Sequence, residues 1–138
     1  MKLSRTVAYA LQATVQLAQS ESGSPVPCSH LASEGHMPER FLLQILRNLV
    51  NHGILQSTRG VDGGYTLERS PDEISLLDII EAIEGPLHSN LPLTGGLPAE
   101  SHEQLRIALQ QITETARAQL ESIKLANLLP ANQVHASA

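Results

Sequence analysis

The stretch PERFLLQILRNLVNHGILQSTRGVDGGYTL, residues 38–67, contains the signals that decide the fold. Its first half carries apolar residues at helical spacing, in a broad stripe formed by Phe41, Leu42, Ile45, Leu46, Leu49 and Val50. Pro38 stands where proline favours a helix start, and Gly53 stands where glycine ends one. The segment predicts an amphipathic helix over about 38–51, whose other face carries Arg40, Leu43, Gln44, Arg47 and Asn51.

The second half of this stretch predicts a β-hairpin. Residues 54–58 and 65–68 are short apolar and β-branched runs that favour strands. Between them, RGVDGG at 59–64 places three glycines in six residues, which is typical of a hairpin turn. The hairpin would carry Arg59 at its tip.

Upstream, Ser4 is a candidate cap for a helix that runs to about Gln19. One face of that helix would carry Val7, Leu11, Thr14 and Ala18. The segment 21–27 is a loop by composition, and residues 29–34 predict a short second helix that Gly35 ends.

Downstream, Ser75 to Asp78 is a capping-box signature for a fourth helix that ends at Gly85. Prolines and glycines make 86–100 a loop, and Ser101 begins another candidate capping box. A long helix to about 128 follows, and its apolar stripe suits packing against another helix: Leu105, Leu109, Ile112, Ala116, Leu120 and Ile123. Residues 130–138 are expected to be a flexible tail.

This order of elements predicts a mainly α fold with a small β-hairpin wing, a winged helix-turn-helix. The helix-turn-helix spans about 28–51 and the wing about 54–68, within a DNA-binding domain of residues 1–85. A variable loop follows at 86–100, and then a long helix at 101–129, the candidate dimerisation helix, whose stripe could pack against a partner or against its own domain. The major groove of B-DNA admits one α-helix, so the helix at 38–51 would bury its stripe and turn its other face to the bases.

The predicted DNA contacts follow from this placement. Arg40 and Gln44 lie one turn apart on the free face, and such side chains pair with guanine and adenine. Arg59, with Gly60 beside it, would enter the minor groove, where a narrow groove focuses negative potential. Arg47, Ser4 and Arg5 are candidates for phosphate contacts, although a solvated surface position would explain Arg47 and a helix cap would explain Ser4.

Composition limits the other functions. The chain has 138 residues, one cysteine and a net charge of −5. One cysteine excludes an internal disulfide and a four-cysteine zinc site. Neither a signal peptide nor an apolar run of about 20 residues is visible, so we expect a cytoplasmic protein without membrane contact.

The charge differs between the two halves of the chain. Residues 1–70 carry six Lys/Arg and five Asp/Glu, a net +1, whereas residues 71–138 carry three Lys/Arg and nine Asp/Glu, a net −6.

Five motifs in order resemble one family. They are MKLSRTVAYALQA at 1–13, FLLQIL at 41–46 with GILQS at 53–57, RGVDGGYTL at 59–67, ISLLDIIEAIEG at 74–85 and IKLANLL at 123–129. Together they are similar to the Rrf2-type (IscR/NsrR/CymR-like) winged helix-turn-helix transcription regulators, over nearly the whole chain except 86–100. The resemblance implies a homodimer, held by the long helix, that represses transcription from a palindromic operator on double-stranded DNA.

The chain departs from the family at two places. Cluster-binding members carry three cysteines in the loop before the long helix, and some add a ligand from the first helix. Here residues 87–99 contain no cysteine, and Ala8 and Gln12 stand at the first-helix positions. We therefore expect neither an iron–sulfur cluster nor another metal or cofactor. Position 43, often polar in the family, is Leu43, which cannot accept a hydrogen bond from cytosine.

Other interpretations stay open at this point. Cys28 is a candidate thiol sensor, although an inert small residue is the simpler interpretation. His88 and His102 flank the loop and could hold a metal across it. The acidic second half is compatible with a winged-helix interaction module whose partner is a metabolic enzyme or another protein. No nucleophile elbow or phosphate loop is present, so an enzyme is not expected.

Overall fold

Eight helices and strands follow one another in the computed structural model, which describes residues 2–20, 23–89 and 94–130. They are α1 (Arg5–Gln19), α2 (Cys28–Gly35), α3 (Glu39–Asn51), β1 (Leu55–Thr58), β2 (Gly64–Leu67), α4 (Leu76–Glu84), α5 (Ala99–Ser122) and the 3₁₀ helix η1 (Leu125–Leu128). This is the predicted mainly helical winged fold. The predicted flexible tail falls on 131–138, outside the described residues.

The core lies where α1, α2 and α3 meet. Leu42, Leu46 and Leu49 of α3 are completely buried, as are Ala10 and Ala13 of α1. The small alanines let α1 approach its neighbours, while the leucines fill the space between the helices. The predicted α1 face is partly wrong, because Leu11 and Ala18 are only half-buried.

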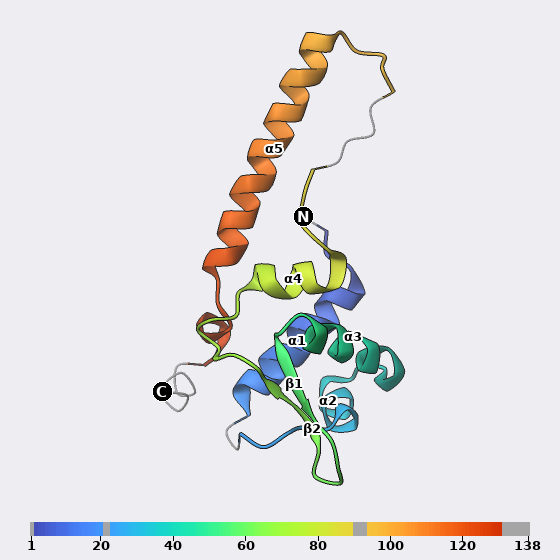
Figure 1. Cartoon of the computed structure of the whole chain (residues 1–138), viewed down its shortest axis with the longest axis vertical. Coiled ribbons are helices and arrows are strands. Elements are labelled where there is room, and N and C mark those ends of the chain that lie inside the picture. The colour runs from blue at the N-terminus through green and yellow to red at the C-terminus, as the bar shows by residue number, and fades with distance from the viewer. Residues whose placement is uncertain (1, 21–22, 90–93, 131–138) are drawn as a thin grey trace.

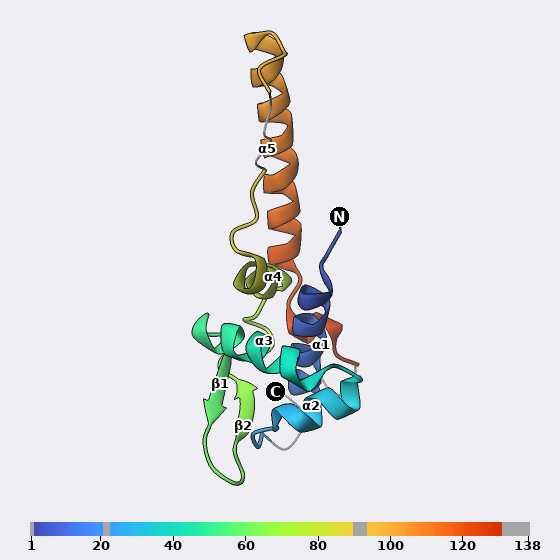
Figure 2. The same ribbon diagram turned by 90° about the vertical axis from the view of Figure 1, so that its right-hand side faces the viewer.

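The wing is a two-stranded antiparallel hairpin with Leu55 opposite Leu67 and Thr58 opposite Gly64. Leu55 anchors the base of the hairpin in the core, where it is 1% exposed. Figures 1 and 2 show the hairpin loop at one end of the molecule and α5 extending from the other. The wing and the long helix therefore point in opposite directions.

The capping box predicted for α4 is confirmed. The backbone N–H of Asp78 donates to Ser75 Oγ at 3.0 Å, and the Ser75 N–H donates to Asp78 Oδ2 at 3.0 Å. These two bonds satisfy donors that a helix start leaves unpaired. Leu77, Ile79, Ile80 and Ala82 then face the core.

The prediction of one helix over 101–129 is wrong at both ends. Helix α5 begins at Ala99 after Pro98, so Ser101 is not its cap. It ends at Ser122 because the next residues form an isolated bridge with the start of α4. The Leu76 N–H donates to the Ile123 carbonyl and the Leu125 N–H to the Ile74 carbonyl, both at 2.9 Å. The helix must stop there so that Leu125 can be fully buried.

Candidate nucleic-acid interface

Helix α3 presents a polar face to solvent. Arg40, Gln44 and Arg47 are all exposed, and they lie opposite the buried leucines of the same helix. Within the described part of the chain, the side chains of Arg40 and Gln44 form no hydrogen bond. Their donors and acceptors are therefore available to another molecule.

Phe41 corrects the predicted apolar stripe. It was expected to face inward, yet 62% of the residue is exposed. One residue turns the helix by about 100°, so Phe41 lies one such step away from buried Leu42, at the margin of the stripe. Leu43 lies at the other margin and is half-buried. The sequence did not reveal that Phe41 is exposed, because the predicted stripe includes every apolar residue whatever its angle from the centre of the stripe.

The wing tip holds Arg59 and Gly60, which directly follow β1 and are both exposed. The side chain of Arg59, like that of Arg40, makes no hydrogen bond to any described residue. Gly60 has a φ of +114°, which disfavours a residue with a side chain. At Gly63 an added Cβ would lie 2.2 Å from the Thr58 carbonyl oxygen, so the turn itself requires this glycine. The crowding at Gly63 comes from within the hairpin rather than from approaching DNA.

Strand β2 of the wing is joined to the segment just before α2. Val26 and Tyr65 exchange two backbone hydrogen bonds, of 3.0 Å and 2.9 Å, in an isolated antiparallel bridge. Tyr65 is half-buried and packs against the core. At Gly64 an added Cβ would lie 2.4 Å from the Val26 backbone. Because the helix-turn-helix and the wing share this bridge, their relative position is fixed.

The start of α1 lies beside α3. Arg5, Tyr9, Phe41 and Gln44 help to line one groove of about 350 Å³ between the two helices. Arg5 is exposed and lines the same groove as Gln44. Ser4 accepts a hydrogen bond from the Val7 N–H at 3.2 Å, which is an ordinary helix cap. The cap accounts for Ser4 without a phosphate.

Cys28 lies behind the α3 surface. Its Sγ is 3.8 Å from the Glu39 carbonyl oxygen, to which the thiol donates, and the residue is half-buried. Burial, and to a smaller extent the negative charge of Glu39, raise the pKa of the Cys28 thiol. A raised pKa lowers the thiolate fraction at neutral pH, which opposes a role as a sensor.

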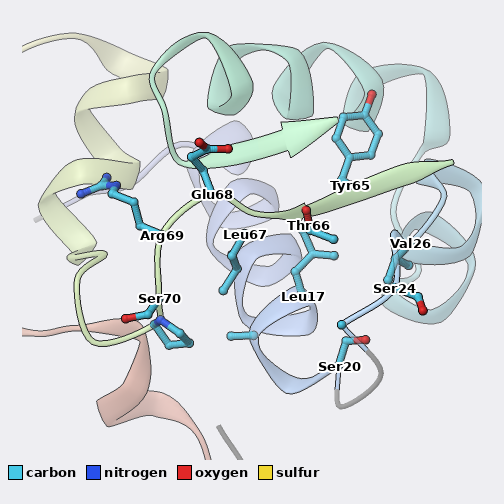
Figure 3. A pocket seen from close by; sticks show the side chains of 13 residues that line it. Leu17, Ser20, Ser24, Val26, Tyr65, Thr66, Leu67, Glu68, Arg69 and Ser70 are labelled. Carbon is cyan, nitrogen blue, oxygen red and sulfur yellow. The ribbon is translucent and has the colours of Figure 1, made fainter. Parts of the chain in front are cut away.

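A second hollow lies on the other side of the wing. It has a volume of about 370 Å³ between the C-terminal end of α1 and β2, and Figure 3 shows Leu17 and Leu67 beside each other there. Arg69, on its rim, donates to the Gly53 carbonyl and pairs with Asp78 at 3.6 Å. None of the predicted DNA contacts lines this hollow, so it is separate from the α3 surface.

Metal-ligand geometry is absent from the described ranges, 2–20, 23–89 and 94–130. They hold no group of three or more His, Cys, Asp or Glu side chains that could bind an ion. A search of the same residues finds no helix with the length and apolar character that a membrane crossing requires.

Comparison with known proteins agrees with this geometry. Residues 3–131 match the Rrf2 family model, described as "Iron-dependent Transcriptional regulator". The transcriptional regulator CymR of Bacillus subtilis is 34% identical over 107 residues, which are 78% of this chain and 78% of CymR. The solved structure of CymR, "the Global Cysteine Regulator of B. subtilis", superposes with a TM-score of 0.75 and 30% identity, over 93% of this chain and 95% of that one.

A second solved structure, T. potens IscR, has a TM-score of 0.69 and 27% identity, and the match covers 93% of this chain and 85% of that one. The agreement therefore extends beyond the helix-turn-helix to nearly the whole chain. With a winged helix-turn-helix whose polar face and wing arginine are exposed, the protein belongs to the Rrf2 family of DNA-binding transcription regulators.

Proposed function

We propose that this regulator is a homodimeric repressor that binds a palindromic operator, with α3 in the major groove and the wing in the adjacent minor groove. The observation that carries the proposal is the exposure of Arg40, Gln44 and Arg59 on α3 and the wing, which pack against each other through β1. The wing is also held to the segment before α2 by the Val26–Tyr65 bridge. A fixed distance between two groove-reading elements suits recognition of a defined DNA sequence.

Base recognition is assigned to the N-terminal half of α3. Arg40 can donate two hydrogen bonds to guanine, and Gln44 can pair with adenine. Exposed Phe41, between them in the sequence, supplies an apolar contact for a thymine methyl group. Arg59 would insert into the minor groove, and Arg5 and Arg47 would neutralise phosphates at the edges of the site.

The net charge of −5 does not conflict with this arrangement. The acidic residues concentrate in the second half of the chain, whereas the four arginines proposed to meet DNA all lie before residue 60. Attraction between exposed charges is screened beyond about 8 Å at physiological salt, so the local charge governs binding.

The dimer is assigned to α5. Helix α5 has no buried residue along its described length, and Ile112 is 65% exposed. A groove of about 680 Å³ runs beside Ile112, Ala116 and Leu120. A second copy of the same helix would cover this face in a two-fold arrangement, in which each apolar surface meets its own equivalent.

We further propose that this member works without an iron–sulfur cluster, despite the description of its family. Such clusters are held by cysteine thiolates. The residues here do not fit that chemistry, because Cys28 is the only cysteine and lies in α2, hydrogen-bonded toward α3. We place its action in the cytoplasm, where bacterial regulators meet DNA, and leave an effector or protein partner open.

Selection from random-sequence DNA tests the proposal. We expect the wild type to enrich a palindrome, and Arg59→Ala to lose about 1–3 kcal/mol of binding free energy on it. Arg106→Ala, which removes an exposed arginine from α5, is the matched control and should bind like the wild type. If the wild type and Arg59→Ala bind equally weakly and without sequence preference, an interaction module becomes the better interpretation.

A further inference from the structure

Three chain segments meet at one ion pair between α4 and α5. Arg117 Nη1 pairs with Glu81 Oε2 and also donates to the Leu87 carbonyl at 3.3 Å. The Leu87 N–H donates to the same Glu81 oxygen at 2.7 Å. The side chains of α4 and α5 and the backbone of the following loop therefore form a closed triangle of hydrogen bonds.

This pair differs from the other ion pair of α5. Arg106 and Glu103 are three residues apart on one helix, and both side chains are 52% exposed. Arg117 and Glu81 are 36 residues apart and their side chains are 37% and 24% exposed. The first pair joins α5 to itself, so only the second pair constrains how α5 is oriented.

The orientation of α5 depends mainly on α4, the helix that its C-terminal half packs against. The C-terminal end of α5 is attached to α4 by the bridge between Ser75 and Lys124, and no residue of the helix itself is buried. Figure 1 shows α5 extending from that end, away from the remaining helices. A helix attached at one end can swing, whereas a second attachment about 9 Å further along its axis, at Arg117, gives it a direction.

We infer that Arg117 is a positioning residue that sets the distance between the two DNA half-sites this regulator accepts. The inference rests on the proposed dimer, in which α5 of one protomer is fixed against α5 of the other. The angle between α4 and α5 then determines how far apart the two α3 helices lie. A 24-residue helix is about 36 Å long, so a tilt of roughly 10° moves one end by about 6 Å. That displacement is comparable to the rise of about two base pairs.

The test measures half-site spacing rather than affinity alone. The probes are duplexes that carry the palindrome selected by the wild type, with its centre shortened or lengthened by one or two base pairs. We expect the wild type to prefer one spacing by about tenfold or more over its neighbours. Arg117→Met, which keeps the aliphatic length, should reduce that preference to about threefold or less. Dimerisation by sedimentation should be unchanged.

Two variants make the result specific. Arg106→Met removes the other arginine of an α5 ion pair and should keep the wild-type spacing profile. Glu81→Gln keeps the size of the side chain and removes its charge, so it should flatten the profile like Arg117→Met and serves if the latter does not fold.

The failures of the two proposals are distinguishable. If the wild type enriches no palindrome, the proposed function fails first. If it does, and both Arg117→Met and Glu81→Gln are folded dimers with the wild-type spacing profile, the inference about Arg117 is wrong while the proposed function stands.

Discussion

Helix α3 buries four of its thirteen residues, whereas the 24-residue α5, which the structure describes in full, buries none. Both helices carry an apolar stripe in the sequence. The α3 stripe meets α1 and α4 of its own chain, while the α5 stripe, only partly covered by α4, leaves Ile112 mostly exposed. The same sequence pattern thus has two structural outcomes. The α3 stripe forms the core of the fold, and the exposed part of the α5 stripe is the surface that we propose contacts a second copy.

The largest expected effect is in the α3 core. Leu46 is completely buried, so Leu46→Ala leaves a cavity and should lower the free energy of unfolding by about 2–5 kcal/mol. Urea titration followed by circular dichroism measures this loss. Arg47→Ala, its exposed neighbour, should change stability by no more than about 0.5 kcal/mol. Equal effects of the two substitutions would contradict the assignment of the core.

A smaller effect on folding, with a large effect on assembly, is expected in α5. Ile112→Glu puts a charge on the exposed apolar face and removes about 1.5–3 kcal/mol of hydrophobic burial from the dimer contact. Sedimentation should show a shift toward monomer, while the circular dichroism of the helical core is retained. Ala118→Glu adds the same charge at an exposed position of α5 that does not line the groove beside Ile112, and should leave the dimer intact. Loss of the dimer in both variants would show that charge, not the Ile112 face, is responsible.

How much of this difference could be predicted depends on the range of the interactions involved. Helix α3, the hairpin and the Ser75 capping box follow from local patterns, because their signals lie within a few residues. The end of α5 at Ser122 does not, since it results from hydrogen bonds between residues 123–125 and 74–76. A local pattern carries no information about a partner fifty residues away.

The interface shows the same limit. Arg40, Gln44 and Arg59 are exposed where the pattern placed them, but Phe41 was assigned to the wrong side because it lies at the margin of the stripe, about 100° around the helix from buried Leu42. The Glu81–Arg117 pair was missed entirely. Each of its members is an ordinary charged residue on a helix, and only the packing of α4 against α5 brings them together.

The smallest expected effect concerns Cys28, which lies at the boundary between core and surface. Because its pKa is raised, its thiolate fraction at pH 7.5 is lower than that of an ordinary cysteine. We expect alkylation by iodoacetamide to be slower than that of a cysteine peptide, by about threefold or more. As the pH is raised, the alkylation rate of Cys28 should increase at a higher pH than the rate of the peptide does. Unfolding in urea should remove the difference. A rate faster than the peptide's would favour a thiol sensor.

The side chains of Arg40, Gln44 and Arg59 make no hydrogen bond within the described structure. This has an evolutionary consequence. If these residues read DNA as proposed, replacing any of them would change which DNA is chosen with little loss of folding stability, since surface substitutions away from packed features usually alter it by less than about 0.5 kcal/mol. Duplicated copies of such a gene can therefore acquire different target promoters through a few substitutions. Selection on regulation and selection on folding act on separate residues of the same two elements.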